Sequence, residues 1–291
     1  LNMVTGSAQT VGRAIVEEER IRAVSFTGGV EAGREIYSRA AQKLKRVALE
    51  LGSKNPLIVM EDADIGLAVE GILFGAFGTS GQRCTATSRV LVHEKVYAEV
   101  MDQLLRRTRA INVGDPLNPS VDMGPVCGRE QEMKVLRYID IGLKEGARLI
   151  CGGKKLTEGD YGRGFFVEPT IFEANHGLRI TKEEIFGPVL SLMHVNTIED
   201  AIALANSGVY GNQASLFTSS GSAARKFRYE VEAGNVGINI GVAAPMAFFP
   251  FSGWKDSFFG DMHGQSMDAV EFFTQKKVVV ERWPKEWMRK F

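Results

Sequence analysis

Cysteine and histidine are scarce in this sequence, and neither sign of charge prevails. The 291 residues include only three cysteines and four histidines, and their spacing does not match a zinc site, so no metal centre is predicted. An odd number of cysteines is typical of free thiols in a reducing compartment rather than of a disulfide framework. Lys plus Arg and Asp plus Glu both number 35, which leaves no basic excess to hold nucleic acid or anionic lipid.

Long apolar runs are also absent. No stretch reaches the ~20 residues that a membrane-spanning helix needs. Residues 1–10 show neither the basic start nor the apolar core of a secretory signal. We therefore expect a cytoplasmic protein, with neither nucleic acid nor membrane as a partner.

The residues that are present favour α/β layers. Hydrophobic residues make up 44% and charged residues 24%, a globular composition. Short β-branched runs alternate with stretches of helical period, which predicts sheets with flanking helices. Strands are predicted at residues 22–27, 46–51, 56–61, 89–93, 147–151, 164–172, 189–195, 213–218 and 274–283, helices at 10–19, 31–45, 95–110, 129–145, 198–206 and after a cap at Asp64, and a loop at 241–267.

Cys84 is the first candidate for chemistry. It follows the run Gly-Thr-Ser-Gly-Gln-Arg and precedes Thr-Ala-Thr-Ser, a small and polar neighbourhood that is unusual for a packed thiol. A reactive cysteine needs an accessible, electropositive setting that stabilises its thiolate, and adjacent Arg83 and free backbone N–H groups are expected to supply it. The alternative is burial as a small hydrophobic side chain, which suits Cys151 better.

Glu50 is the candidate for a general base. It lies in the apolar run Val-Ala-Leu-Glu-Leu, which a glycine ends. A carboxylate in such a strand loses hydration, which raises its pKa toward the range that suits a base. The alternative is a glutamate at a strand end that points to solvent.

Two further segments have the character of ligand-binding turns. The turn Gly28–Gly29 separates a predicted strand from a helix, where backbone N–H groups can meet a phosphate, although most such glycines are there for steric reasons. In Glu-Glu-Ile-Phe-Gly-Pro, Glu184 is placed to accept ribose hydroxyls and Phe186 to flank a flat heterocycle. The alternative is an ordinary turn before a strand, with Phe186 in the core.

Taken in order, these segments resemble the aldehyde dehydrogenase superfamily. The likeness covers nearly the whole chain, and its tail, PMAFFPFSGWKDSFFGD, looks most like the methylmalonate-semialdehyde dehydrogenase branch and related semialdehyde oxidisers. The matching segments are SFTGGVEAG (Ser25–Gly33), LELGSKNP (Leu49–Pro56), GQRCTATSR (Gly81–Arg89), EEIFGPV (Glu183–Val189) and PFSGWK (Pro250–Lys255).

The resemblance implies a role for each of these residues. Cys84 would be the nucleophile and Glu50 the base that hydrolyses a thioester, with NAD or NADP as hydride acceptor. Glu184 would bind the nicotinamide ribose, and Phe186 would pack near the nicotinamide. The resemblance also places Gly28 by the cofactor phosphates and Phe251 in the aldehyde tunnel.

The resemblance also implies a division of the chain. Residues 1–52 would be the later part of a Rossmann-type dinucleotide-binding domain, 53–256 the catalytic domain and 257–291 a returning tail. The family's upstream asparagine and lysine have no counterpart before residue 22, so we expect the chain to be the later part of a longer enzyme. The family usually has Gly-Ser where this chain has Gly28-Gly29, and a second glycine where Ser53 stands.

Two alternatives to hydrolytic oxidation stay open. Acylating methylmalonate-semialdehyde enzymes pass the acyl group to coenzyme A and typically lack the glutamate of the LELG motif, so the presence of Glu50 favours hydrolysis. The other alternative is a non-catalytic domain that only self-associates. The sequence leaves open the aldehyde, the choice between NAD and NADP, and the oligomeric number.

Two hypotheses concern the substrate and assembly. Arg83, on the Cys84 loop, is expected to aim its guanidinium at a substrate carboxylate, with Phe248, Phe249 and Phe251 as the walls of a narrow pocket. The alternative roles of that arginine are to raise the local electrostatic potential, which stabilises the thiolate, or to bond neighbouring backbone carbonyls. The run 274–283 brackets three valines with charged residues and is expected to pair with a neighbouring subunit in a homo-oligomer, a dimer or tetramer.

Overall fold

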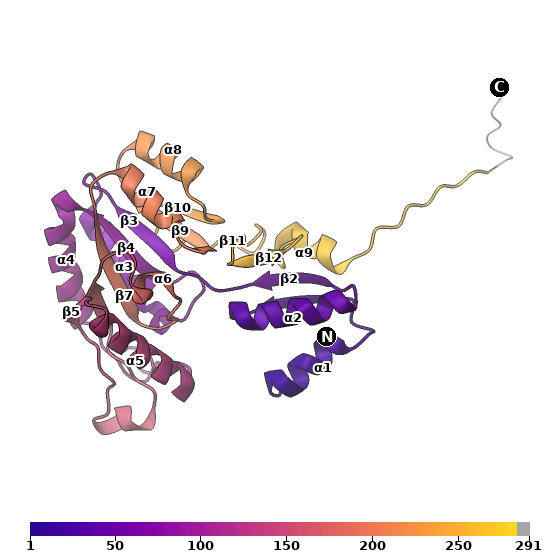
Figure 1. Cartoon of the computed structure of the whole chain (residues 1–291), viewed down its shortest axis with the longest axis horizontal. Coiled ribbons are helices and arrows are strands. Elements are labelled where there is room, and N and C mark those ends of the chain that lie inside the picture. The colour runs from indigo at the N-terminus through magenta and orange to yellow at the C-terminus, as the bar shows by residue number, and fades with distance from the viewer. Residues whose placement is uncertain (284–291) are drawn as a thin grey trace.

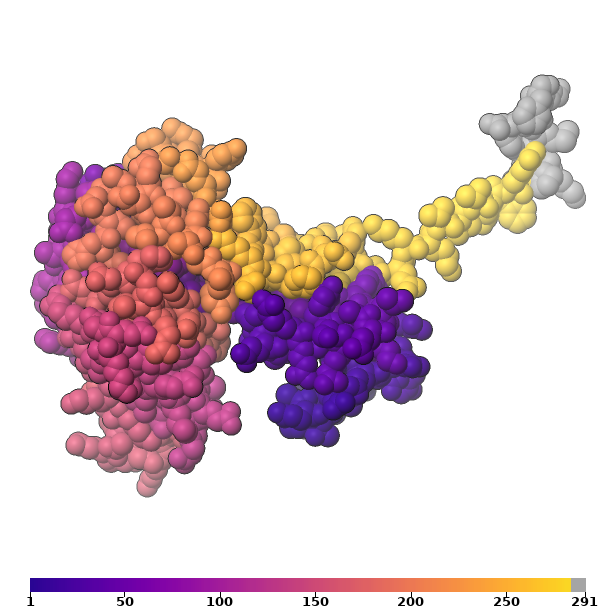
Figure 2. All heavy atoms as spheres, viewed as in Figure 1, coloured from indigo at the N-terminus to yellow at the C-terminus, as the bar shows by residue number. Residues whose placement is uncertain are grey.

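The computed structural model describes residues 1–283, which form two main sheets with flanking helices (Figure 1). This is the α/β architecture that the sequence predicted. The N-terminal lobe and the larger body are visible side by side in Figure 2, with the yellow C-terminal segment lying along the lobe. Among the described residues, no helix has the length and apolarity to cross a membrane.

The smaller sheet is a parallel βαβ unit with one added strand. β1 (Ala23–Thr27) pairs with β2 (Arg46–Glu50), and α2 (Val30–Gln42) connects them. β12 (Phe258–Gly260) returns from the far end of the chain and pairs antiparallel with β2. A small core of Val47, Leu49 and Leu51 packs against α1 (Arg13–Glu17), which follows the turn η1 (Ala8–Gly12).

The larger sheet has seven strands in the order β10-β9-β3-β4-β7-β6-β5, and only β5 runs antiparallel to its neighbour. Its central strands are buried on both faces, which explains their nearly continuous apolar sequences. The strands are β3 (Asn55–Val59), β4 (Thr87–His93), β5 (Arg148–Cys151), β6 (Thr170–Glu173), β7 (Val189–Val195), β9 (Gln213–Phe217) and β10 (Asn235–Ile238).

Helices cover both faces of the larger sheet. Leu57 and Val59 of β3 face α3 (Ile65–Phe77) and α4 (Glu94–Arg109), whereas Ile58 between them faces α7 (Ile198–Asn206) and α8 (Gly221–Glu230). This alternation follows from the two-residue period of a strand. The remaining elements are α5 (Arg129–Lys144), α6 (Arg179–Lys182), α9 (Ser266–Phe273), the turns η2 (Gly78–Gly81) and η3 (Gly159–Arg163), and the short strands β8 (Tyr210–Gly211) and β11 (Trp254–Lys255).

Three sequence predictions differ from the structure. Strand β6 begins at Thr170 rather than at residue 164, because Pro169 before it has no N–H for a ladder. The predicted loop 241–267 contains β11 and β12. Residues 274–283 form no strand in the described chain; they extend away from the body (Figure 1), and Val278, Val279 and Val280 are 87%, 65% and 91% exposed.

Pairing of this extended segment with a second copy of the chain stays a prediction. Deleting residues 275–291 should lower the oligomer mass on a sizing column, because three exposed valines in extended backbone invite a partner strand. The deletion keeps Thr274, whose carbonyl accepts a hydrogen bond from Arg46 at 2.9 Å. Deleting 284–291 alone retains the valines and serves as the control. An unchanged mass after the longer deletion would argue against the assignment.

Candidate active site

The candidate site residues meet where the two sheets adjoin. β3, β4 and β7 are parallel neighbours, so their first residues lie at one edge of the larger sheet. Ser53 precedes β3, Cys84 precedes β4, and Glu184 precedes β7. The chain enters this edge directly from β2, whose last residue is Glu50. The fold thereby brings together segments that are about a hundred residues apart in sequence.

A tightly constrained turn carries the Cys84 loop. Thr79 and Ser80 adopt left-handed conformations with φ of 53° and 54°, which cost energy for residues with a Cβ. Gly81, at φ 66°, packs so closely that a Cβ would stand 2.3 Å from the carbonyl oxygen of Gly187. This contact holds the Cys84 loop against the loop that carries Glu184.

The electrostatic setting of Cys84 differs from the predicted one. The side chain is half-buried, and this burial raises the pKa of its thiol; the negative charges of Glu50 and Glu184 raise it further. Hydrogen bonds from the backbone N–H groups of Cys84 and Thr85 act in the opposite direction. The surroundings of Cys84 thus combine two carboxylates, which oppose the thiolate, with backbone N–H groups and the charge of Arg83, which favour it.

The hydrogen bond and the ring contact of Arg83 are with Phe74 and not with the Cys84 thiol. Its Nη2 donates a hydrogen bond to the carbonyl oxygen of Phe74 at 2.6 Å, and the guanidinium lies 4.6 Å from the centre of the Phe74 ring. Both contacts are on α3. The Nε atom is buried and, among residues 1–283, has no hydrogen-bond partner, so one donor is left for a ligand.

Glu50 has the environment that its sequence predicted. Burial raises the pKa of its carboxyl group to about 7. Both carboxylate oxygens are buried, and neither has a hydrogen-bond partner among the described residues. A carboxyl group in this state is poised to exchange a proton near neutral pH.

Glu184 is fixed by the backbone of the β2–β3 connection. Its Oε1 accepts a hydrogen bond from the Ser53 N–H at 2.7 Å. Burial raises the pKa of Glu184, while this hydrogen bond and the charges of Lys134 and Lys54 counteract the rise. The neighbouring Gly52 leaves room for the carboxylate, since a Cβ there would lie 3.1 Å from Oε2.

Phe186 has a strained backbone conformation, and the Gly28–Gly29 turn is bonded to the end of β2. Phe186 is half-buried with φ of 59°, and Gln131 Nε2 holds its carbonyl oxygen at 2.6 Å. The Gly28 N–H donates to the carbonyl oxygen of Glu50 at 3.0 Å, which ties the glycine turn to the candidate base. A Cβ at Gly29 would meet nothing within 4 Å, so serine would also fit there.

A cavity of about 380 Å³ beside the turn was missed by the sequence reasoning. Its walls come from η1, α1, β1 and α2, and they include Gln9, Gly12, Val16, Phe26, Ile36 and Arg39. A glycine-bounded run of small residues at 6–12, next to the predicted helix, was the signal that could have indicated it. The cavity is mainly apolar, with polar groups at its rim, as binding sites for flat ligands usually are.

Lys54 is another residue that the pattern did not single out. Burial, with the charge of Arg89, lowers the pKa of its amine to about 7, and the charge of Glu184 partly offsets this. Its Nζ is buried without a hydrogen-bond partner in the described chain. With Lys134, it contributes positive charge that counteracts the raised pKa of Glu184.

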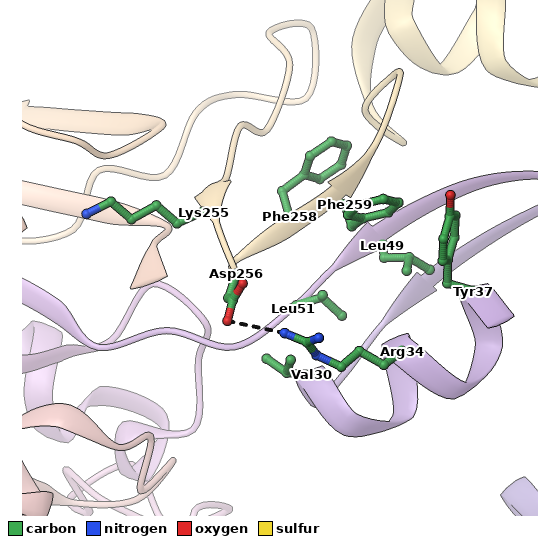
Figure 3. Close-up of a pocket in the computed structure, with 9 residues that line it drawn as sticks. All are labelled: Val30, Arg34, Tyr37, Leu49, Leu51, Lys255, Asp256, Phe258 and Phe259. Atoms are coloured by element: carbon green, nitrogen blue, oxygen red, sulfur yellow. Dashed lines mark ion pairs between the residues drawn. The ribbon is translucent and has the colours of Figure 1, made fainter. Parts of the chain in front are cut away.

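The aromatic tail does not form the predicted narrow pocket. Phe248 and Phe249 are 67% and 56% exposed and pack on each other, while Phe251 is half-buried before β11. Figure 3 shows a separate cavity of about 400 Å³ in which α2 and β12 face each other, with the ion pair Arg34–Asp256 at 3.5 Å on its rim. None of the predicted site residues lines this second cavity.

The site combines a thiol, a carboxyl group without a hydrogen-bond partner in the described chain, and a second carboxylate held by the backbone. Cys84 offers a thiol with two backbone N–H groups beside it, and Glu50 offers an unbonded carboxyl group. Glu184 and the cavity beside Gly28 have the hydrogen-bonding and apolar character that a ribose and a flat ring require. Among residues 1–283, no group of three or more His, Cys, Asp and Glu side chains is placed to hold a metal ion.

Comparisons with known proteins show the family of the chain. The family model described as "Aldehyde dehydrogenase family" matches residues 1–279. A malonate-semialdehyde dehydrogenase of Bacillus subtilis (strain 168) is 44% identical over 284 residues, which cover 97% of this chain and 58% of the relative. The corresponding protein of Bacillus pumilus (strain SAFR-032) is 43% identical with the same coverage. The chain thus spans little more than half the length of the curated relatives it matches.

Solved structures give the same result. A Sinorhizobium meliloti protein assigned as a methylmalonate-semialdehyde dehydrogenase, in complex with NAD, superposes with a TM-score of 0.92 at 34% identity and covers 95% of this chain and 57% of its own. Betaine aldehyde dehydrogenase from Staphylococcus aureus, in complex with NAD⁺, superposes with a TM-score of 0.85 at 35% sequence identity. The match covers 87% of this chain and 50% of the betaine aldehyde dehydrogenase. On the sequence match over residues 1–279 and these superpositions, the chain belongs to the aldehyde dehydrogenase family.

Proposed function

We propose that the protein with this chain oxidises a semialdehyde to the corresponding acid, with Cys84 as nucleophile, Glu50 as base and NAD or NADP as cofactor. The observation that carries the proposal is the convergence of Cys84, Glu50 and Glu184 at one sheet edge. The raised pKa of Glu50 suits a base, the Ser53 N–H fixes Glu184, and the backbone N–H groups beside Cys84 favour its thiolate against the effect of burial and of the two carboxylates. The semialdehyde class follows from the malonate-semialdehyde dehydrogenases among the relatives.

The residues define a sequence of steps. The Cys84 thiolate adds to the aldehyde carbon, and the backbone N–H groups stabilise the oxyanion of the resulting thiohemiacetal. NAD(P)⁺, when bound, would supply the hydride acceptor, and loss of a hydride from that carbon would leave a thioester on Cys84. Glu50 then takes a proton from water, whose oxygen attacks the thioester carbon; the C–S bond breaks, which releases the acid and the Cys84 thiolate, and Glu50 returns its proton to solvent.

We also propose which residues contact the cofactor. Glu184, fixed by Ser53, is placed to accept hydrogen bonds from ribose hydroxyls, and Phe186 stands two residues further on. The Gly28 turn would contact the phosphates, and the cavity of about 380 Å³, which Phe26 and Ala32 on either side of that turn help to line, suits the flat ring at the other end of a dinucleotide.

Product analysis tests this function directly. The protein is supplied with malonate semialdehyde and NAD⁺ or NADP⁺, and reduced cofactor and carboxylic acid are measured with and without coenzyme A. Acid formation without coenzyme A supports the hydrolytic function. An acyl-coenzyme A product would instead identify the acylating alternative. Absence of NAD⁺ binding and of turnover, both in this chain and in a version extended at its N-terminus, would leave only the self-associating alternative.

Arg83 is proposed to recognise the carboxylate of the substrate. Replacing it with leucine should lower kcat/KM for a short semialdehyde by more than ~10-fold, since a charge-assisted hydrogen bond contributes about 1.5–3 kcal/mol. The expected loss is much smaller for an uncharged aldehyde of similar length. Steady-state kinetics on the two substrates measures the difference, and Arg83→Lys is the charge-retaining control. Equal losses on both substrates would assign Arg83 to its observed contacts with Phe74.

A further inference from the structure

We infer that Asn55 is a positioning residue for the nucleophile: its side-chain amide fixes the peptide unit that follows Cys84. The inference deepens the proposed function, because it rests on Cys84 as the reacting group. Asn55 is the first residue of β3 and is only 1% exposed. It therefore acts through its hydrogen bonds rather than by contact with substrate.

The Asn55 amide joins three segments of the site. Its Nδ2 donates to the carbonyl oxygens of Cys84 at 2.8 Å and Ala86 at 2.9 Å, and it also lies 3.3 Å from Ser53 Oγ. Its Oδ1 accepts the N–H of Gln213, the first residue of β9, at 3.0 Å. One side chain thus ties the Cys84 loop to the sheet and to the segment that holds Glu184.

The backbone around Asn55 explains why a side chain, rather than a backbone N–H, binds these carbonyl oxygens. The pairing of β3 with β4 shifts register between Asn55 and Pro56. Proline has no N–H to donate, so the backbone at this point lacks a donor for the carbonyls of the neighbouring loop. The side-chain amide of Asn55 provides the two N–H donors for the Cys84 and Ala86 carbonyls that the interrupted strand pairing does not provide.

The bond to the Cys84 carbonyl has a direct consequence for the thiol. The carbonyl of Cys84 and the N–H of Thr85 belong to one planar trans peptide, in which they point in opposite directions. Because the Asn55 amide binds the Cys84 carbonyl oxygen, the Thr85 N–H of the same peptide points away from Asn55. That N–H is one of the two backbone donors that lower the pKa of the Cys84 thiol. Asn55 thus aims a donor at the thiolate without touching it.

Only an amide meets the requirements of this position. Aspartate has the same shape, but its carboxylate offers acceptors where the Cys84 and Ala86 carbonyls need donors. Serine brings no charge and one hydroxyl donor, so it can satisfy only one of the two carbonyls. The pair Asn55→Asp and Asn55→Ser therefore separates loss of the donors from introduction of a negative charge.

The test is the pH dependence of Cys84 alkylation by iodoacetamide, measured on this chain by mass spectrometry of the Cys84 peptide. Alkylation reports the thiolate and needs neither cofactor nor aldehyde. We expect Asn55→Asp to move the midpoint of the profile up by about one pH unit or more, and Asn55→Ser to move it in the same direction by less. The exposed Cys127 in the same samples is the internal reference and should keep its profile.

Asn235→Asp is the matched control. Asn235 is also buried, and its Nδ2 also donates to two carbonyl oxygens, those of Asn212 at 3.0 Å and Ser252 at 2.6 Å. Its substitution should destabilise the fold to a similar degree but leave the Cys84 profile unchanged. An unchanged profile in folded Asn55→Ser would overturn the inference, as would an equal shift in Asn235→Asp. Should Asn55→Asp fail to fold, Asn55→Ser alone decides.

The two hypotheses fail in different measurements. If Cys84 is not the nucleophile, Cys84→Ala keeps its turnover, while the alkylation profile still shows whether Asn55 acts on the thiol. If Asn55 has no effect on the thiol, the profile stays unchanged, while Cys84→Ala still loses activity.

Discussion

Replacing Cys84 with alanine should abolish aldehyde oxidation, with a loss on the order of 10⁴-fold or more, because the covalent route has no other nucleophile. The fold should survive, since a half-buried thiol contributes little packing energy, about 1 kcal/mol or less. Formation of reduced cofactor measures the activity, and a thermal unfolding curve measures the stability.

The other two cysteines provide matched controls for this substitution. Cys127 is exposed, and the half-buried Cys151 lies on β5, at the far edge of the larger sheet. Cys127→Ala and Cys151→Ala should therefore both retain activity. Substantial turnover in Cys84→Ala, or its loss in either control, would contradict the mechanism.

The sequence predicted the parts of the fold in which local pattern and tertiary packing agree. The strand at residues 189–195 and the helix at 198–206 match β7 and α7, and Thr197 caps that helix by accepting the N–H of Asp200. The cap at Asp64 is likewise present. In these segments the apolar period, the cap and the buried face all specify the same element, so one sequence is enough to locate it.

Segments whose structure depends on distant partners were missed or wrong. β12 is only three residues long and exists because the edge of β2 is available to it. The predicted strand at 274–283 has the β-branched composition of a strand but no partner in the described chain. Composition predicts which residues tolerate extended backbone, whereas a strand also needs a second edge.

The candidate site shows the same division. The sequence could identify Cys84 and Glu184 as residues in unusual turns, but only the pairing of β4 with β7 shows that these turns are neighbours. The direction in which the pKa of Cys84 is shifted depends on burial and on the charges of Glu50 and Glu184, which come from two other segments. The part played by Asn55 depends on where its amide points. Neither property has a signature in local pattern.

Glu50→Gln should separate the two halves of the proposed reaction. The variant should still produce a first burst of reduced cofactor, because forming the thioester requires Cys84 and not the base. Its steady-state rate should fall by about 10²-fold or more, because water is no longer activated by a carboxylate. Rapid-mixing absorbance measures the burst, and Glu70→Gln, on the exposed side of α3, is the isosteric control.

The pH profile supplies a second signature of Glu50. Burial raises the pKa of its carboxyl group to about 7, so below that pH the group is mostly protonated and cannot accept a proton from water. The steady-state rate of the parent protein should therefore rise with pH through about 7 wherever thioester hydrolysis limits turnover, and this rise should vanish in Glu50→Gln. A variant with the parent rate and the parent profile would remove Glu50 from the mechanism. Because the thioester would then need another acceptor, that result would favour transfer of the acyl group to coenzyme A.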